Sequence, residues 1–300
     1  MYKKTVIHVF TNNCCNIKYN PYDLTSYWGL GDLIRGSIKL YQYSQIMRFN
    51  YYVDISLHPI SKYLINSEHQ YTQLVQDNKD NIEYYYIDKL KDPLKNKLRN
   101  ADDVILLTTN DKIAETLPIT DDCKEFILNI FKPKPEFKLY FNNYVNNILK
   151  LKSDYTICHF RLGDYAALNN IDDMESFLNT YITNDYISVE HDILLTDNKK
   201  LKKYVLDNNI MVTPNTKIRH VGKESDDDEN YKDDEDDEDN QDNQDNQDDE
   251  NDGTRDTLLD FFLLLNSKGI KTYTVYSWVS GFVYWASVLK DIPLTLLNNS

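Results

Sequence analysis

Cysteine is scarce in this sequence of 300 residues, which has only Cys14, Cys15, Cys123 and Cys158. No two of them stand in a C-x-x-C arrangement, so the usual ligand pair of a structural zinc site is missing. The scattered cysteines also form no disulfide framework, which is typical of a reducing compartment. These spacings exclude a disulfide-rich secreted domain and predict no metal site.

Long apolar runs are missing as well. The longest run near the end of the chain, Phe261–Leu265, is far shorter than the roughly 20 residues that a membrane-spanning helix needs. The apolar run at the start of the chain is interrupted at His8 and ends at Thr11, so it is typical of a first strand rather than of a signal peptide. We therefore expect a cytoplasmic protein without a membrane span.

Outside one segment the sequence has little net charge of either sign. The total is −15, but residues 224–252 alone hold eighteen acidic residues and one lysine, and removing their −17 leaves +2. A nearly neutral chain has no basic field to attract nucleic acid, so we expect no nucleic-acid partner. Because residues 224–252 have almost nothing to bury, they are predicted to be a disordered acidic insert, and their D-x-D triplets predict no metal site.

The rest of the sequence alternates between strand-like and helix-like patterns, which predicts an α/β protein with mostly parallel sheets. We place a first Rossmann-like domain at residues 1–152 and a second at 153–300, which contains the acidic insert. Residues 66–100 have little periodicity and are predicted to be loops and short elements. The expected strands are Thr5–Phe10, Tyr51–Ser56, Asp103–Thr108, 154–160, 191–197, Lys217–Val221 and Thr272–Tyr276. The expected helices begin at Asp32 and Pro59 and cover Asp122–Phe131, Pro135–Leu151, Asp172–Tyr181, Lys199–Leu206, Arg255–Lys268, capped by Thr254 and ended by Gly269, and Val283–Leu289.

The chemistry-bearing stretch of the second half is Cys158-His159-Phe160-Arg161-Leu162-Gly163-Asp164. It follows a strand of β-branched and aromatic residues, so Arg161 lies at the strand's carboxyl end, where open parallel sheets bind ligands. A guanidinium there suggests an anionic ligand such as a phosphate. The alternative is a structural ion pair between Arg161 and Asp164. Asp197 also follows a buried-type strand, at the same edge.

The first half offers a glycine-bearing turn, Gly29-Leu30-Gly31-Asp32, between a strand and a helix that Asp32 is placed to cap. Glycines let a backbone approach a ligand closely, and the first N–H groups of a helix favour negative charge. Asp32 would repel a phosphate, so a sugar hydroxyl is the better partner at this position. The alternative is a tight turn that only begins the helix.

These motifs occur in a known order. The stretch from His159 to Asp164 resembles the H-x-R-x-x-D motif of the fucosyltransferases that form α(1→2) and α(1→6) linkages and of the protein O-fucosyltransferases. The turn at Gly29–Asp32 is similar to the glycine loop that opens the first helix in that superfamily. The remaining matches are Leu195-Thr196-Asp197-Asn198, the acid-led stretch Asp260–Leu265, Ser277-Trp278-Val279-Ser280-Gly281-Phe282 and Trp285-Ala286-Ser287-Val288-Leu289.

The resemblance implies a GT-B fold of two Rossmann-like domains, with the donor nucleotide held mainly by the second and the acceptor by the first. It implies a glycosyltransferase that moves fucose from GDP-fucose to a hydroxyl of a glycan or protein, with inversion. No metal and no cofactor other than the GDP-sugar substrate is implied.

By motif position, Arg161 would grip the donor diphosphate and stabilise the leaving group, and Asp32 is a candidate general base. His159 and Asp260 would lie near guanine, with Asp256 as an alternative to Asp260. The other donor-site positions implied are Gly29, Gly31, Asp164, Asp197, Ser277, Ser280 and the Gly281 amide.

The sequence departs from the family pattern at two positions. Leu162 stands where the α(1→2) and α(1→6) enzymes often carry a second arginine, which implies a weaker donor grip or a closer likeness to the O-fucosyltransferases. Asp32 replaces the asparagine of the glycine loop, which leaves acceptor positioning open. Two alternatives therefore stay open: the same fold with another nucleotide sugar, or a catalytically inactive GT-B domain that acts as a binding or scaffold module.

Overall fold

The computed structural model describes residues 4–10, 29–56, 58–65, 82–87, 104–109, 117–151, 154–163, 171–216 and 253–297. The acidic insert at 224–252, the strand expected at Lys217–Val221 and the site candidate Asp164 lie outside the described residues. Within the described ranges, no helix has both the length and the apolar character needed to cross a membrane.

The first half of the chain forms a parallel sheet of four strands in the order β2-β1-β4-β3. β1 is buried along its whole length, because helices cover the sheet and its strands need no polar face. One of these strands, β3, lies in the stretch for which loops and short elements were predicted, and was not predicted as a strand. Its tyrosine-rich sequence has strand propensity without alternation, and parallel strands do not require alternation. The bounds are β1 Thr5–Val9, β2 Asn50–Asp54, β3 Ile82–Ile87 and β4 Val104–Thr109.

The helices of the first half agree with the predicted positions but differ at their ends. Helix α1 begins at Leu30, and its N-cap is Gly29 rather than Asp32, which lies in the first turn. Thr120 caps α4 by accepting a hydrogen bond from the Cys123 amide at 3.3 Å. The bounds are α1 Leu30–Met47, the 3-10 helix η2 Pro59–Tyr63, α4 Asp121–Ile130, and α5 Pro135–Asn143, which continues as the π-helix η5 Tyr144–Ile148.

The second half forms another parallel sheet, in the order β6-β5-β7-β8. Helix α8 begins at Gly253, so Thr254 lies inside the helix and not at its cap, and Gly269 opens β7 instead of ending the helix. The short strand β8, which follows Pro293, was not predicted. The bounds are β5 Thr156–Arg161, α6 Ile171–Thr183, β6 Asp192–Thr196, α7 Lys199–Asp207, α8 Gly253–Leu265, β7 Gly269–Thr274, α9 Gly281–Lys290 and β8 Leu294–Leu296.

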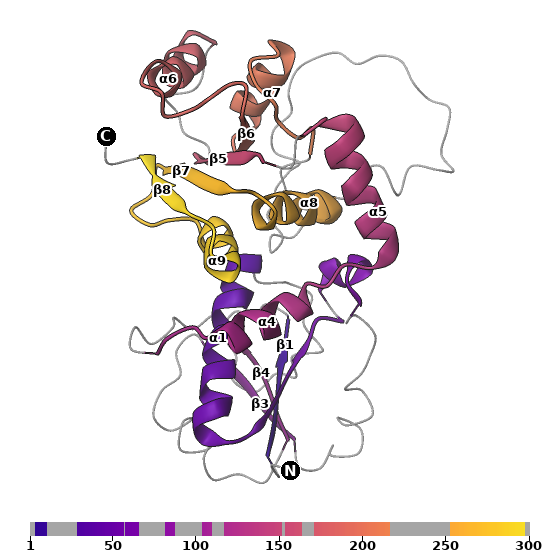
Figure 1. Ribbon diagram of the computed structural model, residues 1–300. Helices are drawn as coiled ribbons and strands as arrows, with labels where there is room; N and C mark the ends of the chain where they lie inside the picture. Colours follow the sequence, from indigo (N-terminus) through magenta and orange to yellow (C-terminus); the bar gives the residue numbers. More distant parts are fainter. Residues whose placement is uncertain are drawn as a thin grey trace, which may run out of the picture.

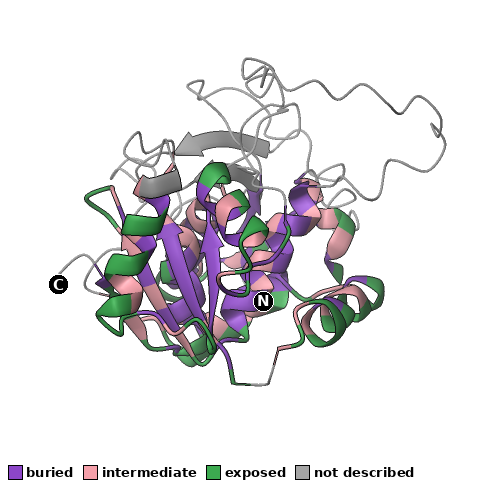
Figure 2. Cartoon of the chain, turned by 90° about the horizontal axis from the view of Figure 1, so that it is seen from above, coloured by how far each residue is buried: buried purple, intermediate pink, exposed green. Residues whose placement is uncertain are grey.

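The two faces of the second sheet are covered by different helices. Cys158 and Phe160 of β5 pack with α6 and α7, whereas Ile157 packs with α8 and α9. Side chains alternate along a strand, so His159 and Arg161 lie on the α8 and α9 face. Figure 1 shows α6 and α7 above these strands and α8 and α9 below them, toward the first half of the chain. Figure 2 shows the strands buried between helices whose outer sides are exposed.

Helices α1 and α9 join the two halves by packing at their first turns (Figure 1). A Cβ atom placed on Gly31 would lie 2.7 Å from the carbonyl carbon of Gly281 and 2.9 Å from the amide nitrogen of Phe282. A single apolar core continues across this junction, where the rings of Phe131 and Phe261 are 5.3 Å apart. At the other end of α9, Lys124 donates to Asp291 at 2.6 Å. The domain boundary at residue 152 stays a prediction.

We expect Gly31→Ala to lower the free energy of unfolding by about 1–3 kcal/mol, because backbone atoms must shift to admit the methyl group. Gly281→Ala is a matched control, since a Cβ there would approach Gly31 to only 3.5 Å, an ordinary contact. Urea unfolding followed by circular dichroism measures both variants. An unchanged or raised unfolding free energy for Gly31→Ala, as helix propensity alone predicts, would contradict the close helix contact.

Candidate functional site

Arg161 is the last residue of β5, as the sequence predicted. The chain goes from β5 to β6 on one side and later returns to β7 on the other, so the strand order reverses between β5 and β7. Ligands of open α/β sheets bind at this reversal, outside the carboxyl ends of the strands. Arg161 pairs in register with Thr274, the last residue of β7, and thus lies at the reversal.

The carboxylate of Asp197, just after β6, holds Arg161 in place. Arg161 Nη1 donates to Asp197 Oδ2, and the backbone N–H groups of Leu162 and Gly163 donate to Oδ1 at 2.7 and 3.0 Å. The Asp197 side chain is 10% exposed and the Arg161 side chain 28% exposed, so solvent only partly screens the pair. Arg161 thus forms an ion pair with Asp197, whereas the predicted pair with Asp164 lies outside the described residues. A direct contact of Asp197 with the donor stays a prediction.

The neighbours of Asp197 in the T-D-N motif, Thr196 and Asn198, also help to hold the turn after β5. Thr196 Oγ1 accepts from the Asn198 amide at 3.1 Å. Asn198 donates from its side chain to the Gly163 carbonyl at 2.8 Å and caps α7 by accepting from the Leu201 amide at 2.9 Å. Gly163 has a φ of +54°, which favours glycine. The motif therefore fixes the turn after Arg161 to the start of α7.

Two aromatic residues beside Arg161 were not among the predicted site residues. The Arg161 guanidinium carbon lies 5.7 Å from the centre of the Tyr276 ring, and Tyr276 stacks on Trp278 with centroids 5.3 Å apart. Trp278 is 65% exposed, which is unusual for a tryptophan. The signal in the sequence was their position in the loop after a parallel strand, where binding residues gather.

His159 is buried in the sheet, two residues before Arg161. Its Nδ1 lies 3.1 Å from Thr272 Oγ1 on the neighbouring strand. Burial lowers the pKa of His159 to about 4, with the nearby Arg161 adding to the effect and Asp197 opposing it. His159 is therefore a neutral imidazole at neutral pH, which can offer hydrogen bonds but no charge.

The loop after β7 leads from Tyr276 through the predicted residues Ser277 and Ser280 to Gly281, the first residue of α9. Ser280 makes no side-chain hydrogen bond as a cap, so its hydroxyl does not satisfy the first N–H groups of α9. These N–H groups and the helix dipole favour an anion at this position.

The turn Gly29–Asp32 lies against the start of α9 through Gly31. The close packing against Gly281 is enough to explain why residue 31 is a glycine. A ligand contact at Gly31 stays a prediction. The Gly29 carbonyl accepts from the Asp32 and Leu33 amides at 3.0 and 3.1 Å. Burial raises the pKa of Asp32, and Arg35, which donates to Asp32 Oδ1 at 2.6 Å, opposes the rise.

Helix α8, which carries Asp260, covers the side of the sheet on which His159 and Arg161 lie. Both carboxylate oxygens of Asp260 are 3.3 Å from the hydroxyl of Thr216. Burial raises the pKa of Asp260 to about 7, with Lys202 and Thr216 opposing the rise and Asp256 adding to it. Asp256, the alternative candidate, lies 3.6 Å from Arg255 Nε.

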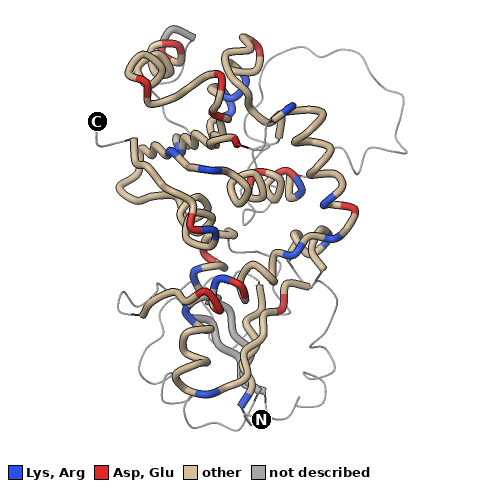
Figure 3. Tube along the Cα trace, viewed as in Figure 1, with Lys and Arg blue, Asp and Glu red and all other residues tan. Residues whose placement is uncertain are grey.

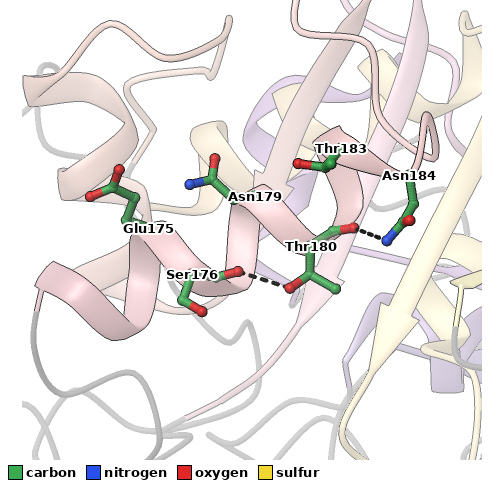
Figure 4. A pocket seen from close by; sticks show the side chains of 6 residues that line it. All are labelled: Glu175, Ser176, Asn179, Thr180, Thr183 and Asn184. Atoms are coloured by element: carbon green, nitrogen blue, oxygen red, sulfur yellow. Dashed lines mark hydrogen bonds between the residues drawn. The ribbon is translucent and has the colours of Figure 1, made fainter.

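A separate surface pocket of about 590 Å³ lies along α6 (Figure 4). Two of its polar groups bond to the helix backbone: Thr180 Oγ1 donates to the Ser176 carbonyl, and Asn184 Nδ2 donates to the Thr180 carbonyl. Helix α6 covers the face of the sheet opposite Arg161, so this pocket is not part of the candidate site. Its lining residues are Glu175, Ser176, Asn179, Thr180, Thr183 and Asn184.

Figure 3 shows basic and acidic residues interspersed along the described trace. Among the residues that the structure describes, no three His, Cys, Asp or Glu side chains are grouped to hold a metal ion. Of the predicted site residues, the structure brings Arg161 into contact with Asp197 and Gly31 into contact with Gly281.

No protein-family model matches this chain, and no curated protein sequence matches it. Solved structures do match. FUT1 from Arabidopsis thaliana, a mutant in complex with GDP, is 11% identical over 98% of this chain and 70% of that chain, with a TM-score of 0.53. The fucosyltransferase NodZ from Bradyrhizobium is 10% identical over 98% of this chain and 96% of that chain, with a TM-score of 0.52.

The chain has the GT-B-like fold of these fucosyltransferases. This confirms the α/β fold class and the structural side of the resemblance seen in the sequence. At these identities the likeness concerns the fold, and the roles of single residues stay predictions.

We expect Asp197→Ala to lower the free energy of unfolding by about 2–3 kcal/mol, because hydrogen bonds to a charged group contribute about 1.5–3 kcal/mol and two backbone donors lose their acceptor. Asp207→Ala, at the exposed end of α7, should change it by less than about 0.5 kcal/mol. Urea denaturation of both variants measures the difference. Equal small effects would show that Asp197 does not hold the β5 turn.

We also expect His159 to make the protein less stable in acid. Its folded pKa of about 4 is below the ordinary value of 6.5, so its contribution is complete above pH 6.5 and is lost as the pH falls toward 4. The unfolding free energy of the wild type should therefore fall more steeply over this range than that of His159→Gln. Parallel curves for the two proteins, measured by urea denaturation at several pH values, would contradict the buried neutral imidazole.

Proposed function

We propose that this protein is an inverting, metal-independent glycosyltransferase that transfers fucose from GDP-fucose to a hydroxyl of a glycan or protein acceptor. The observation that carries the proposal is Arg161, held by Asp197 at the strand reversal of the donor-side sheet. The fucosyltransferase-like fold and the order of the sequence motifs support it.

In the proposed reaction, the acceptor oxygen attacks the anomeric carbon of fucose while the bond from that carbon to the diphosphate oxygen breaks. Negative charge then grows on GDP as it leaves. Arg161 and the N-terminus of α9 lie at the two ends of the Tyr276–Ser280 loop, and both favour that charge. Stabilisation of the leaving group is the main contribution that this arrangement supplies.

The guanine base is proposed to lie between β5 and α8. A carboxylate at Asp260 accepts hydrogen bonds from both the ring N–H and the exocyclic amine of guanine, a pair that uracil lacks. The buried His159 faces the same side of the sheet and supplies a neutral edge. Selectivity for a GDP-sugar over a UDP-sugar would follow from Asp260.

Asp32 is the proposed general base that takes the proton of the acceptor hydroxyl. It follows Gly31, which packs against the first residue of α9, so it lies beside the proposed diphosphate site. The raised pKa of Asp32 makes its carboxylate a stronger base than an exposed aspartate. Acceptors would bind on the first half of the chain.

We expect the wild type to bind GDP and GDP-fucose in EDTA and to bind UDP much more weakly. Arg161→Ala should weaken GDP binding about tenfold to a hundredfold, which corresponds to a lost charged hydrogen bond of about 1.5–3 kcal/mol. Arg161→Lys should recover only part, because lysine lacks the planar fork. Arg48→Ala, at the exposed far end of α1, is the matched control. Isothermal titration calorimetry measures all four proteins.

The outcome separates the remaining alternatives. Equal affinity for GDP and UDP would favour another nucleotide sugar, and binding only with manganese would contradict the metal-free proposal. Selective GDP binding without any hydrolysis or transfer of GDP-fucose would favour a binding or scaffold module. No binding of either nucleotide would overturn the proposal.

A further inference from the structure

Helix α7 carries a buried lysine that the proposed reaction does not use. Lys202 is 7% exposed, whereas its neighbour Lys203 is exposed. Lys202 Nζ donates to the carbonyl oxygen of Thr216 and lies 2.6 Å from Thr216 Oγ1. A buried ammonium is costly without partners, and here both of these contacts go to one threonine.

The same threonine connects Lys202 to Asp260. Thr216 Oγ1 accepts from the ammonium, so its own hydrogen can be donated to the Asp260 carboxylate, whose two oxygens are both 3.3 Å away. Lys202 comes from α7, Thr216 from the segment that follows it and Asp260 from α8. The three side chains thus form a relay across three parts of the chain.

Other charged and titratable groups surround this relay. Asp256, one turn before Asp260, makes the carboxylate form of Asp260 less favourable, and Lys202 and the Thr216 hydrogen bond make it more favourable. Asp256 lies 3.6 Å from Arg255 Nε, and the Arg255 guanidinium lies 4.8 Å from the centre of the Tyr140 ring. Burial raises the pKa values of Tyr140 and Tyr144, so both phenols are neutral at neutral pH.

We propose that Lys202, acting through the Thr216 hydroxyl, is a positioning residue that keeps the Asp260 carboxylate charged and oriented for the guanine edge of the donor. The inference rests on the proposed function and extends it to a residue that does not touch the donor. Removing the cation leaves only the Thr216 hydrogen bond to oppose burial and Asp256, so Asp260 takes up a proton at a higher pH. A neutral carboxyl accepts only one of the two guanine hydrogen bonds.

The experiment measures the affinities for GDP and inosine diphosphate between pH 5.5 and 9. Inosine diphosphate lacks the exocyclic amine of guanine but carries the same two phosphates as GDP, so the ratio of the two affinities cancels the titration of the phosphates. The wild type should prefer GDP above pH 7, near the pKa of Asp260, and lose the preference below it. Lys202→Met should move this midpoint upward by about one pH unit or more.

Matched variants separate this effect from a general loss of structure. Lys203→Met removes a lysine from the exposed side of α7 and should keep the wild-type midpoint. Thr216→Val removes the connecting hydroxyl at nearly constant shape and should move the midpoint in the same direction as Lys202→Met. Thr213→Val is its control, because the buried Thr213 hydroxyl donates to the Leu194 carbonyl instead.

The two proposals fail in different ways. A wild type that binds neither nucleotide would overturn the proposed function itself. A wild type that prefers GDP, with Lys202→Met and Thr216→Val keeping its midpoint, would overturn only the role of Lys202. Weaker binding of Lys202→Met at every pH with an unchanged midpoint would also overturn it, since that result indicates a purely structural lysine.

Discussion

The carboxylate of Asp197 is the contact on which the candidate site depends. It follows β6, yet it binds the last side chain of β5 and the two backbone N–H groups of the turn beyond. Arg161 therefore does not have to be ordered by its ligand, which lowers the entropic cost of binding an anion. The Tyr276 hydroxyl fits against this turn only because residue 163 is a glycine, since a Cβ on Gly163 would lie 2.6 Å from it. The Asp197 carboxylate and the Gly163 turn thus together place Arg161 beside Tyr276.

A second constraint brings the two halves together. The contact of Gly31 with Gly281 is a backbone contact, and it places the first turns of α1 and α9 side by side. Both turns carry residues of the proposed mechanism, Asp32 on one and the uncapped N–H groups of α9 on the other. Buried apolar side chains from both halves also pack into one core across this contact. The proposed base of one half and the proposed anion site of the other therefore lie close to each other.

Much of this arrangement was predictable from local sequence, because strand ends and turns are local properties. Arg161 and Asp197 follow apolar runs that are typical of buried strands, so their place at the carboxyl edge of the sheet was predictable. Their pairing was not, because it depends on the order of the strands in the sheet, which local sequence does not show. The short strand β8 and the tyrosine-rich β3 lacked alternation. A glycine allows either a ligand or another helix to come close to the backbone, so the sequence alone did not show which of the two Gly31 contacts. Lys202 belongs to a lysine-rich helix, where Leu201 and Val205 mark the buried stripe and only the fold shows that Lys202 borders it.

The charges of the site determine how it can hold an anion. Arg161 is paired with Asp197, and Asp32 with Arg35, so the proposed diphosphate meets little net positive charge from these four side chains. These four side chains would therefore contribute little long-range attraction for the proposed donor, and their contribution to its affinity would come from hydrogen bonds at short range. Leu162, in place of a second arginine, has the same consequence. Under the proposed function, donor recognition would depend on the hydrogen bonds at the carboxyl ends of β5 and β7 and on the guanine edge. The charge state of Asp260 would then matter more than it would in a strongly basic cleft.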